Sequence, residues 1–296
     1  MEPTEPTALL HSAFYRFTPL ADPAAAAAEL RALATAHGLT GSVLVAAEGV
    51  NGTVAGAPGD VRAFEAAFTA PCFWGGALQG LAFKHSACTT PPFGRLKVLV
   101  KPEAVALGLP AADAALPAPD EGDPTHLSPA QWRDLLARED LVLLDNRNHF
   151  EYRLGHFRGA VDPGVHNFRD FVAYVQTHAP LWRAQNRPVA MYCTGGIRCD
   201  KTAPWMAGLG LQVYQLQGGV LNYFAALPDA DQEWQGECFV FDNRVALDTR
   251  LQETATTEDQ VYDPALPDEA WRLQRARQLA RAAATPAADA DADDAP

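Results

Sequence analysis

The chain has 296 residues, and 48% of them are hydrophobic, which is enough for two domains with sizeable cores. The acidic N-terminus lacks the basic and apolar regions of a signal peptide, and no uncharged apolar run is long enough to cross a bilayer. We therefore expect a cytoplasmic protein that makes no membrane contact. The formal net charge is −13, but residues 102–123 and 230–296 carry 5 and 15 acidic side chains, so the rest of the chain is nearly neutral and compatible with a basic face for nucleic acid.

Residues 1–101 are predicted to form a ferredoxin-like α+β domain of the acylphosphatase-like kind. Strands are expected at 12–19, 41–47, 52–55 and 81–86, and helices at 23–37 and 58–68. The order strand-helix-strand-strand-helix-strand is that of a ferredoxin-like sandwich. Asn51-Gly52 is a strong turn signal and predicts a hairpin between the second and third strands. A further strand, expected at 96–101, would extend or leave the sheet.

The remainder divides into a linker, a second domain and an extension. Residues 102–123, rich in Ala, Pro and Asp, predict a linker with one helical turn near 103–107. Residues 124–230 alternate apolar strands with helices, which predicts an α/β domain with a mainly parallel sheet. Its strands are expected at 141–144, 189–192 and 213–216. Residues 231–296 predict an extension with a short strand, a charged helix at 267–283 and a disordered acidic tail.

The central motif is Cys193-Thr194-Gly195-Gly196-Ile197-Arg198-Cys199, which lies between a predicted strand and a predicted helix. Two glycines let the backbone curl so that successive N–H groups point at one spot, and the helix start adds a positive dipole end, so we expect an anion there. Arg198 and Lys201 should lower the pKa of Cys193 towards neutrality and make it a nucleophile. The alternative interpretation is a buried structural cysteine at the end of a core strand.

The spacing of this loop separates two chemistries. Cysteine phosphatases use Cys-x5-Arg, which surrounds a phosphate, whereas Cys193 and Arg198 are spaced as Cys-x4-Arg. The tighter loop better fits one additional sulfur, as a persulfide on Cys193. The five cysteines are scattered and odd in number, which favours reduced thiols, and their spacing does not suggest a zinc site, so we expect no metal.

Several other residues could support the loop. Asp145 and Arg147 follow a predicted strand whose carboxyl end should lie beside Cys193; they could form a buttressing ion pair or orient a substrate, or Asp145 could simply cap the next helix. Cys199 could resolve an oxidised Cys193 or point into the core. Lysine is scarce, with four lysines against nineteen arginines, so the four stand out slightly, namely Lys84, Lys97, Lys101 and Lys201.

Two sets of motifs carry a resemblance to known families. The first is Asp145-x-Arg147, Glu151, Gly155-His156-Phe157-x-Gly159-Ala160, the Cys193 loop and Gln217-Gly-Gly219, and through it residues 143–223 look like a rhodanese domain. The second is Ala47-Glu-Gly-Val-Asn-Gly-Thr53, Phe93-Gly-Arg-Leu-Lys-Val98, Leu144-Asp-Asn-Arg-Asn148, Cys193-Thr-Gly-Gly-Ile-Arg-Cys-Asp-Lys201, Tyr214-Gln-Leu-Gln-Gly-Gly219 and Gly236-Glu-Cys-Phe-Val-Phe-Asp242. Through these longer motifs, residues 12–250 resemble more narrowly the tRNA uridine hydroxylases, oxygen-dependent enzymes that make 5-hydroxyuridine at the wobble position.

The resemblance implies a central rhodanese domain with Cys193 as the catalytic, persulfide-forming cysteine, and Arg198 beside it. It implies the tRNA anticodon loop as partner and molecular oxygen as co-substrate, with no cofactor evident. Many members carry a further cysteine cluster after the last motif, but residues 251–296 contain no cysteine. Two alternatives stay open, a thiosulfate- or persulfide-dependent sulfurtransferase and a non-catalytic tRNA-binding module. The sequence carries no signal for an oligomeric state.

Overall fold

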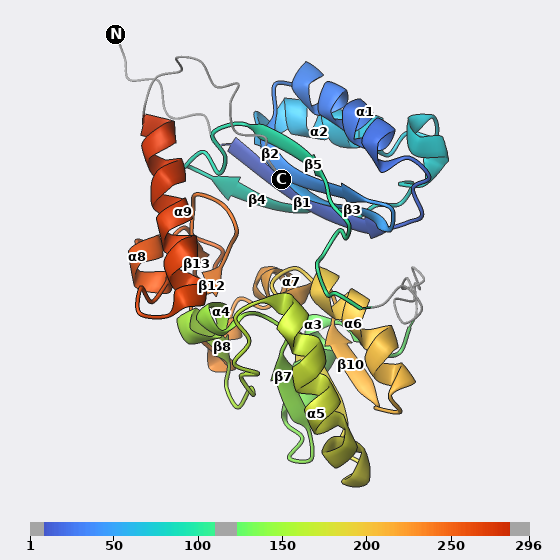
Figure 1. The fold of residues 1–296 in the computed structure, drawn as a ribbon, viewed down its shortest axis with the longest axis vertical. Coiled ribbons are helices and arrows are strands. Elements are labelled where there is room, and N and C mark those ends of the chain that lie inside the picture. Colours follow the sequence, from blue (N-terminus) through green and yellow to red (C-terminus); the bar gives the residue numbers. More distant parts are fainter. Residues whose placement is uncertain (1–8, 110–122, 285–296) are drawn as a thin grey trace.

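A computed structural model describes residues 9–109 and 123–284, which build two separate main sheets (Figure 1). The N-terminal sheet has the strand order β4-β1-β3-β2-β5, and the second has the order β6-β10-β9-β7. The expected class is confirmed, an α+β domain followed by an α/β domain with a parallel sheet. Within the described ranges, no helix combines the length and the apolar character that crossing a membrane requires.

The N-terminal domain has the predicted element order. Its elements are β1 (Leu9–Phe17), α1 (Pro23–Ala36), β2 (Thr40–Ala46), β3 (Gly49–Gly56), α2 (Pro58–Phe68), the 3-10 turn η1 (Phe73–Gly76), β4 (Lys84–Cys88) and β5 (Leu96–Val100). Figure 1 shows α1 and α2 together on one face of the sheet. The strand β5 pairs with β2 in parallel and so extends the sheet.

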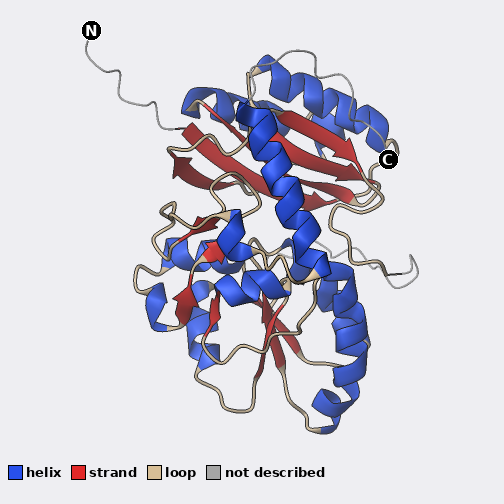
Figure 2. Cartoon of the chain, turned by 60° about the vertical axis from the view of Figure 1, so that its left-hand side comes forward, coloured by secondary structure: helices blue, strands red, loops and turns tan. Residues whose placement is uncertain are grey.

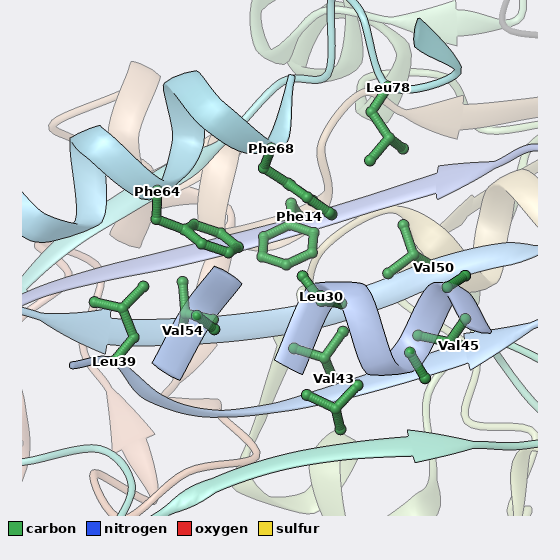
Figure 3. Close-up of a cluster of buried hydrophobic side chains, with 14 of the residues drawn as sticks. Phe14, Leu30, Leu39, Val43, Val45, Val50, Val54, Phe64, Phe68 and Leu78 are labelled. Carbon is green, nitrogen blue, oxygen red and sulfur yellow. The ribbon is translucent and has the colours of Figure 1, made fainter. Parts of the chain in front are cut away.

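The core of this domain lies between the sheet and its two helices. Phe14 of β1 meets Phe68 of α2 with ring centroids 5.1 Å apart, and Leu30 of α1 packs in the same buried cluster (Figure 3). Neighbouring residues of a strand point to opposite faces. Because Phe14 faces the helices, Tyr15 is directed to the other face, towards the second domain.

The predicted turn at Asn51-Gly52 is wrong, because both residues lie inside β3. The chain turns instead at Ala47 and Glu48, just before Gly49 at φ +139°. The Cβ atom of any other residue at position 49 would lie 2.0 Å from the Arg16 carbonyl oxygen. Position 52 of β3 is occupied by glycine because its neighbour on β2, Val43, fills the space that a side chain would need. The strand expected at 81–86 is also displaced, to β4.

The second domain places the two expected strand ends side by side. Its elements are β6 (His126–Leu127), α3 (Pro129–Leu136), β7 (Val142–Asp145), α4 (His149–Leu154), β8 (Gly155–Phe157), η2 (Phe168–Asp170), α5 (Phe171–Ala184), β9 (Val189–Tyr192), α6 (Ile197–Gly208), β10 (Val213–Leu216) and α7 (Gly219–Ala226). The strands β7 and β9 are parallel, and Asp145 pairs in register with Tyr192. Asp145 and Cys193 therefore lie at the same edge of the sheet. No helical turn forms over residues 103–107.

The C-terminal extension packs on the second domain. Its elements are η3 (Ala230–Gln232), β11 (Trp234–Gly236), β12 (Cys238–Phe239), β13 (Ala246–Leu247), α8 (Glu258–Val261) and α9 (Pro267–Ala284). Phe150 of α4 contacts Phe239 and Tyr262 of the extension in a buried cluster. In Figures 1 and 2, α9 runs from this cluster along the side of the N-terminal sheet. The charged helix is confirmed, whereas the expected disordered tail lies outside the described residues.

Candidate functional site

The cysteine loop has the predicted strand-to-helix form. Cys193 follows β9 directly, Thr194 and Gly195 continue the turn, and Gly196 at φ +100° directs the chain into α6, which starts at Ile197. The N–H of Gly196 donates to the Cys193 sulfur at 3.1 Å. A Cβ atom at position 196 would lie 2.8 Å from the Tyr15 hydroxyl, so only glycine fits without rearrangement.

The Cys193 thiol is strongly acidic. Burial alone would raise its pKa, but a hydrogen bond from the Cys199 thiol, the charge of Arg198 and the backbone N–H groups of both residues outweigh burial and lower the pKa to about 5. Cys193 is therefore a thiolate at neutral pH. The anion expected at this spot is the cysteine sulfur itself, and the loop closes tightly around it, with Cys193 only 1% exposed.

Cys199 points into the core, which is one of the two alternatives that the sequence left open. It is fully buried in a cluster of apolar side chains, and its thiol also faces Cys193. Burial raises the pKa of Cys199 far above its ordinary value, and the neighbouring Cys193 raises it further. Cys199 thus stays protonated and acts as a hydrogen-bond donor to the thiolate.

Arg198 is held by a carboxylate that the sequence analysis did not select as a site residue. Both terminal nitrogens of Arg198 donate to Glu151 of α4 at 2.7 Å, and one also reaches the Thr194 hydroxyl at 3.3 Å. Glu151 is fully buried. The guanidinium therefore stabilises the thiolate by its charge, while its hydrogen-bonding edge is occupied by Glu151. The signal for Glu151 was its place in the rhodanese-like segment.

Asp145 and Arg147 form the buttressing ion pair. They are joined by two hydrogen bonds of 2.8 and 2.6 Å, and both side chains are fully buried. Asp145 also accepts from the Tyr192 hydroxyl at 2.7 Å, and Arg147 donates to the Gly155 carbonyl at 2.6 Å. The pair thus fixes β7, β9 and β8 behind the loop. Asp145 does not cap α4, because that position belongs to Asn148.

Lys201 does not supply the free positive charge expected of it. Its ammonium group contacts Glu48 at 2.8 Å and Glu103 at 2.6 Å, and donates to the Val105 carbonyl at 2.8 Å. Two carboxylates from the N-terminal half of the chain neutralise it. The preceding residue, Asp200, accepts from the Tyr15 hydroxyl at 2.8 Å and contacts His126 at 3.1 Å. The first turn of α6 is therefore bound to the N-terminal domain.

Lys84 is the cation that sequence reasoning did not place in the site. It extends from β4 across the domain boundary, donates to the Gly195 carbonyl, and lies 5.1 Å from the centre of the Tyr15 ring. Burial lowers the pKa of Lys84, while the nearby Cys193 thiolate opposes that change. The scarcity of lysine was the one signal for it. Elsewhere in the site, no three His, Cys, Asp or Glu side chains within the described residues are placed to hold a metal ion.

Comparisons with known proteins agree with this architecture. A model of the UPF0176 acylphosphatase-like domain matches residues 10–104, and a rhodanese-like domain model matches residues 128–226. A protein of Nitrobacter winogradskyi named tRNA uridine(34) hydroxylase is 42% identical over 247 residues, which cover 82% of this chain and 93% of that protein. The chain belongs to the tRNA uridine(34) hydroxylase family. Proteins of the same name from Bradyrhizobium diazoefficiens and Deinococcus radiodurans are each 44% identical, over 82% of this chain and 92% and 77% of theirs.

In this member of the hydroxylase family, two of the other motifs that carried the resemblance meet the 193–201 motif, which contains the cysteine loop. The 47–53 motif provides Glu48 to Lys201. The 236–242 motif brings the ring of Phe241 to 6.0 Å from the Arg198 guanidinium carbon. Segments far apart in the sequence thus converge on the first turn of α6.

We predict that Cys193 titrates with a midpoint near pH 5. The thiolate is the form present above the midpoint, so its ultraviolet absorbance should be complete at neutral pH and disappear as the pH falls through about 5. The difference between the wild type and Cys193→Ser isolates this signal. A Cys72→Ser variant, which removes an exposed cysteine, should titrate as the wild type does. A midpoint near that of an ordinary thiol, about 8.5, would contradict the assignment.

Removing the Lys84 charge should make Cys193 less acidic. Lys84→Met should raise the Cys193 midpoint by about one pH unit, because an opposite charge close to a thiolate favours the ionised form. The matched control is Lys101→Met, since Lys101 is exposed and lies one residue beyond β5. The measurement is the same ultraviolet titration. Equal midpoints for the two variants would show that Lys84 does not act on the sulfur.

Breaking the buried ion pair should strongly destabilise the second domain. Arg147→Met leaves the Asp145 charge buried without its partner, so the free energy of unfolding in urea should fall by about 3–5 kcal/mol. Arg138→Met is the control, because Arg138 and Asp140 have the same sequence separation but side chains 43% and 59% exposed. That variant should unfold at nearly the same urea concentration as the wild type, because an exposed ion pair contributes little to stability. Similar losses in both variants would argue against a structural role for the buried pair.

Proposed function

We propose that this protein hydroxylates C5 of the wobble uridine of tRNA to 5-hydroxyuridine, with molecular oxygen as oxidant and Cys193 as the essential thiolate. The observation that carries the proposal is a buried thiolate with a pKa of about 5 in a chain that belongs to the tRNA uridine(34) hydroxylase family. The oxygen dependence and the product rest on the resemblance described above. Arg198 is the charged group that keeps the nucleophile ionised.

A thiolate can activate a pyrimidine by addition. In the proposed step, the Cys193 sulfur forms a bond to C6, and the electron pair of the C5=C6 bond moves to C5 and the C4 oxygen as an enolate. Carbon C5 is then nucleophilic and able to accept an oxygen atom. Loss of the C5 proton and expulsion of the thiolate restore the double bond and free the enzyme.

The balance of the reaction requires a reductant. One atom of O2 enters the C5–H bond as a hydroxyl group, and the other leaves as water. Two electrons and two protons complete that reduction, and we assign their supply to two thiols of the glutathione class, which are oxidised to one disulfide. The N–H groups of the loop stabilise the Cys193 thiolate before it adds to C6 and again when it is expelled.

The wobble uridine is accessible to a protein because the anticodon loop of tRNA is single-stranded. Bases of a single-stranded RNA loop can be turned out of their stack and held by aromatic rings and phosphate contacts, so a protein can hold the wobble base of the anticodon loop in this way. We expect the N-terminal domain to supply part of this grip, because Lys84 and Tyr15 already lie at the loop. A tRNA substrate also fits the cytoplasmic location expected from the sequence.

The decisive experiment uses purified protein, unmodified tRNA and a thiol reductant, with mass spectrometry of the digested nucleosides. In air the wild type should form 5-hydroxyuridine, and heavy-isotope O2 should place its label in the product. Cys193→Ala should form none, whereas Cys72→Ser should retain the activity. Product formed by Cys193→Ala would remove the cysteine from the mechanism, and undiminished product without oxygen would remove O2.

Sulfur transfer is the second candidate, favoured by the match of residues 128–226 to the rhodanese-like domain. A persulfide on Cys193 would pass its outer sulfur to an acceptor thiolate or to cyanide. Assays with thiosulfate and cyanide distinguish the two candidates. Rapid thiocyanate formation together with no change in tRNA would favour the sulfurtransferase.

A further inference from the structure

We infer that Phe241 is the stacking platform for the pyrimidine ring of the target uridine, an inference that rests on the proposed function. Phe241 lies between β12 and β13 and is 59% exposed. Single exposed apolar residues are common and need no explanation by themselves. The position of Phe241 is what sets it apart, since its ring lies 6.0 Å from the guanidinium of Arg198, which stabilises the Cys193 thiolate.

The ring is presented by a rigid support. Phe241 packs edge-on against the buried Phe239, with centroids 4.9 Å apart and an interplanar angle of 89°. The next residue, Asp242, binds Arg244 through hydrogen bonds of 2.8 and 2.7 Å, and both side chains are almost completely buried. A buried ion pair is costly to form, but it restricts the tip of this hairpin to one conformation. The exposed ring is therefore held in place rather than loosely attached.

The same hairpin tip is fixed to the N-terminal domain. Arg244 donates to the Ser86 hydroxyl of β4 at 2.8 Å, and His11 of β1 lies 3.4 Å from Asp242. Asn243 donates to the carbonyl oxygens of Pro91 and Pro92, both at 3.0 Å. In Figure 1 the β12–β13 hairpin lies between the N-terminal sheet and α4. Phe241 thus lies where both domains and the extension meet, beside the cysteine loop.

The chemistry of the site favours a nucleobase as the occupant. The hydrogen-bonding edge of Arg198 is used by Glu151, so Arg198 cannot grip a phosphate with its two terminal nitrogens. Arg198 is only 7% exposed, and the rings of Phe241 and Phe168 both lie 6.0 Å from its guanidinium carbon. Two aromatic rings near one guanidinium form a surface that suits a flat, neutral, polarised ring. A pyrimidine stacked on Phe241 would lie beside Arg198 and the cysteine loop.

The test measures binding of two anticodon stem-loop RNAs, one with uridine and one with an abasic site at the wobble position. Stacking on an aromatic side chain is worth about tenfold in affinity per base. Phe241→Ala should therefore weaken binding of the uridine RNA about tenfold and leave binding of the abasic RNA unchanged. Phe241→Trp should retain the affinity, and Phe241→Leu, which is apolar without a ring, should lose most of it.

The control is Leu181→Ala, which removes a side chain of similar exposure, 53%, on α5. It should bind both RNAs as the wild type does. Equal loss of affinity for both RNAs in Phe241→Ala, or no loss for either, would overturn the inference. Because these measurements need no turnover, they also separate the two proposals. If the wild type formed no 5-hydroxyuridine but Phe241→Ala still lost affinity only for the uridine RNA, hydroxylation would be refuted and the platform retained.

Discussion

The structure depends on keeping one negative charge inside the protein, the thiolate of Cys193. Burial opposes the ionisation of any thiol, because the charged form loses its water. Here that penalty is outweighed by groups of the loop itself, namely the N–H groups of Gly196, Arg198 and Cys199, the Cys199 thiol and the Arg198 charge. These N–H groups are available because the first donors of a helix have no partners within it. A reactive sulfur is thus a local consequence of a strand, a glycine turn and a helix start.

Four consecutive residues at the start of α6 join this loop to the rest of the molecule. Successive helical residues point about 100° apart, so one turn presents side chains in four directions. Each direction has its own partner: Arg198 meets Glu151, Cys199 meets Cys193, Asp200 meets Tyr15 and His126, and Lys201 meets Glu48 and Glu103. Two of these contacts stay within the second domain and two reach the N-terminal half. A turn held from both sides keeps its donors oriented before any substrate arrives, which is the condition for efficient stabilisation of charge.

The sequence predicted what depends on neighbouring residues and missed what depends on distant ones. The strand, glycine turn and helix around Cys193 are local and were predicted. The ion pair between Asp145 and Arg147 is also local, and it was one of the alternatives that the sequence left open. Lys84 reaches Gly195 across 111 positions of sequence, and no periodicity or spacing signals such a contact. The prediction of a turn at Asn51-Gly52 failed for the same reason, because the close approach of Gly49 to the Arg16 carbonyl of β1 decides where the turn needs glycine. Local turn preference is weak compared with the packing of a sheet.

Charge pairing explains why the N-terminal domain supplies a cation. Around the loop, the described ionic side chains other than Lys84 have opposite partners, as in Arg198 with Glu151, Arg147 with Asp145, and Lys201 with Glu48 and Glu103. Among these residues Lys84 has no carboxylate partner at ion-pair distance, and its attraction to the Cys193 thiolate acts across the domain boundary. Separation of the domains would remove this cation and leave more of the burial penalty unopposed. Docking of the N-terminal domain and ionisation of Cys193 are therefore energetically coupled, and each favours the other.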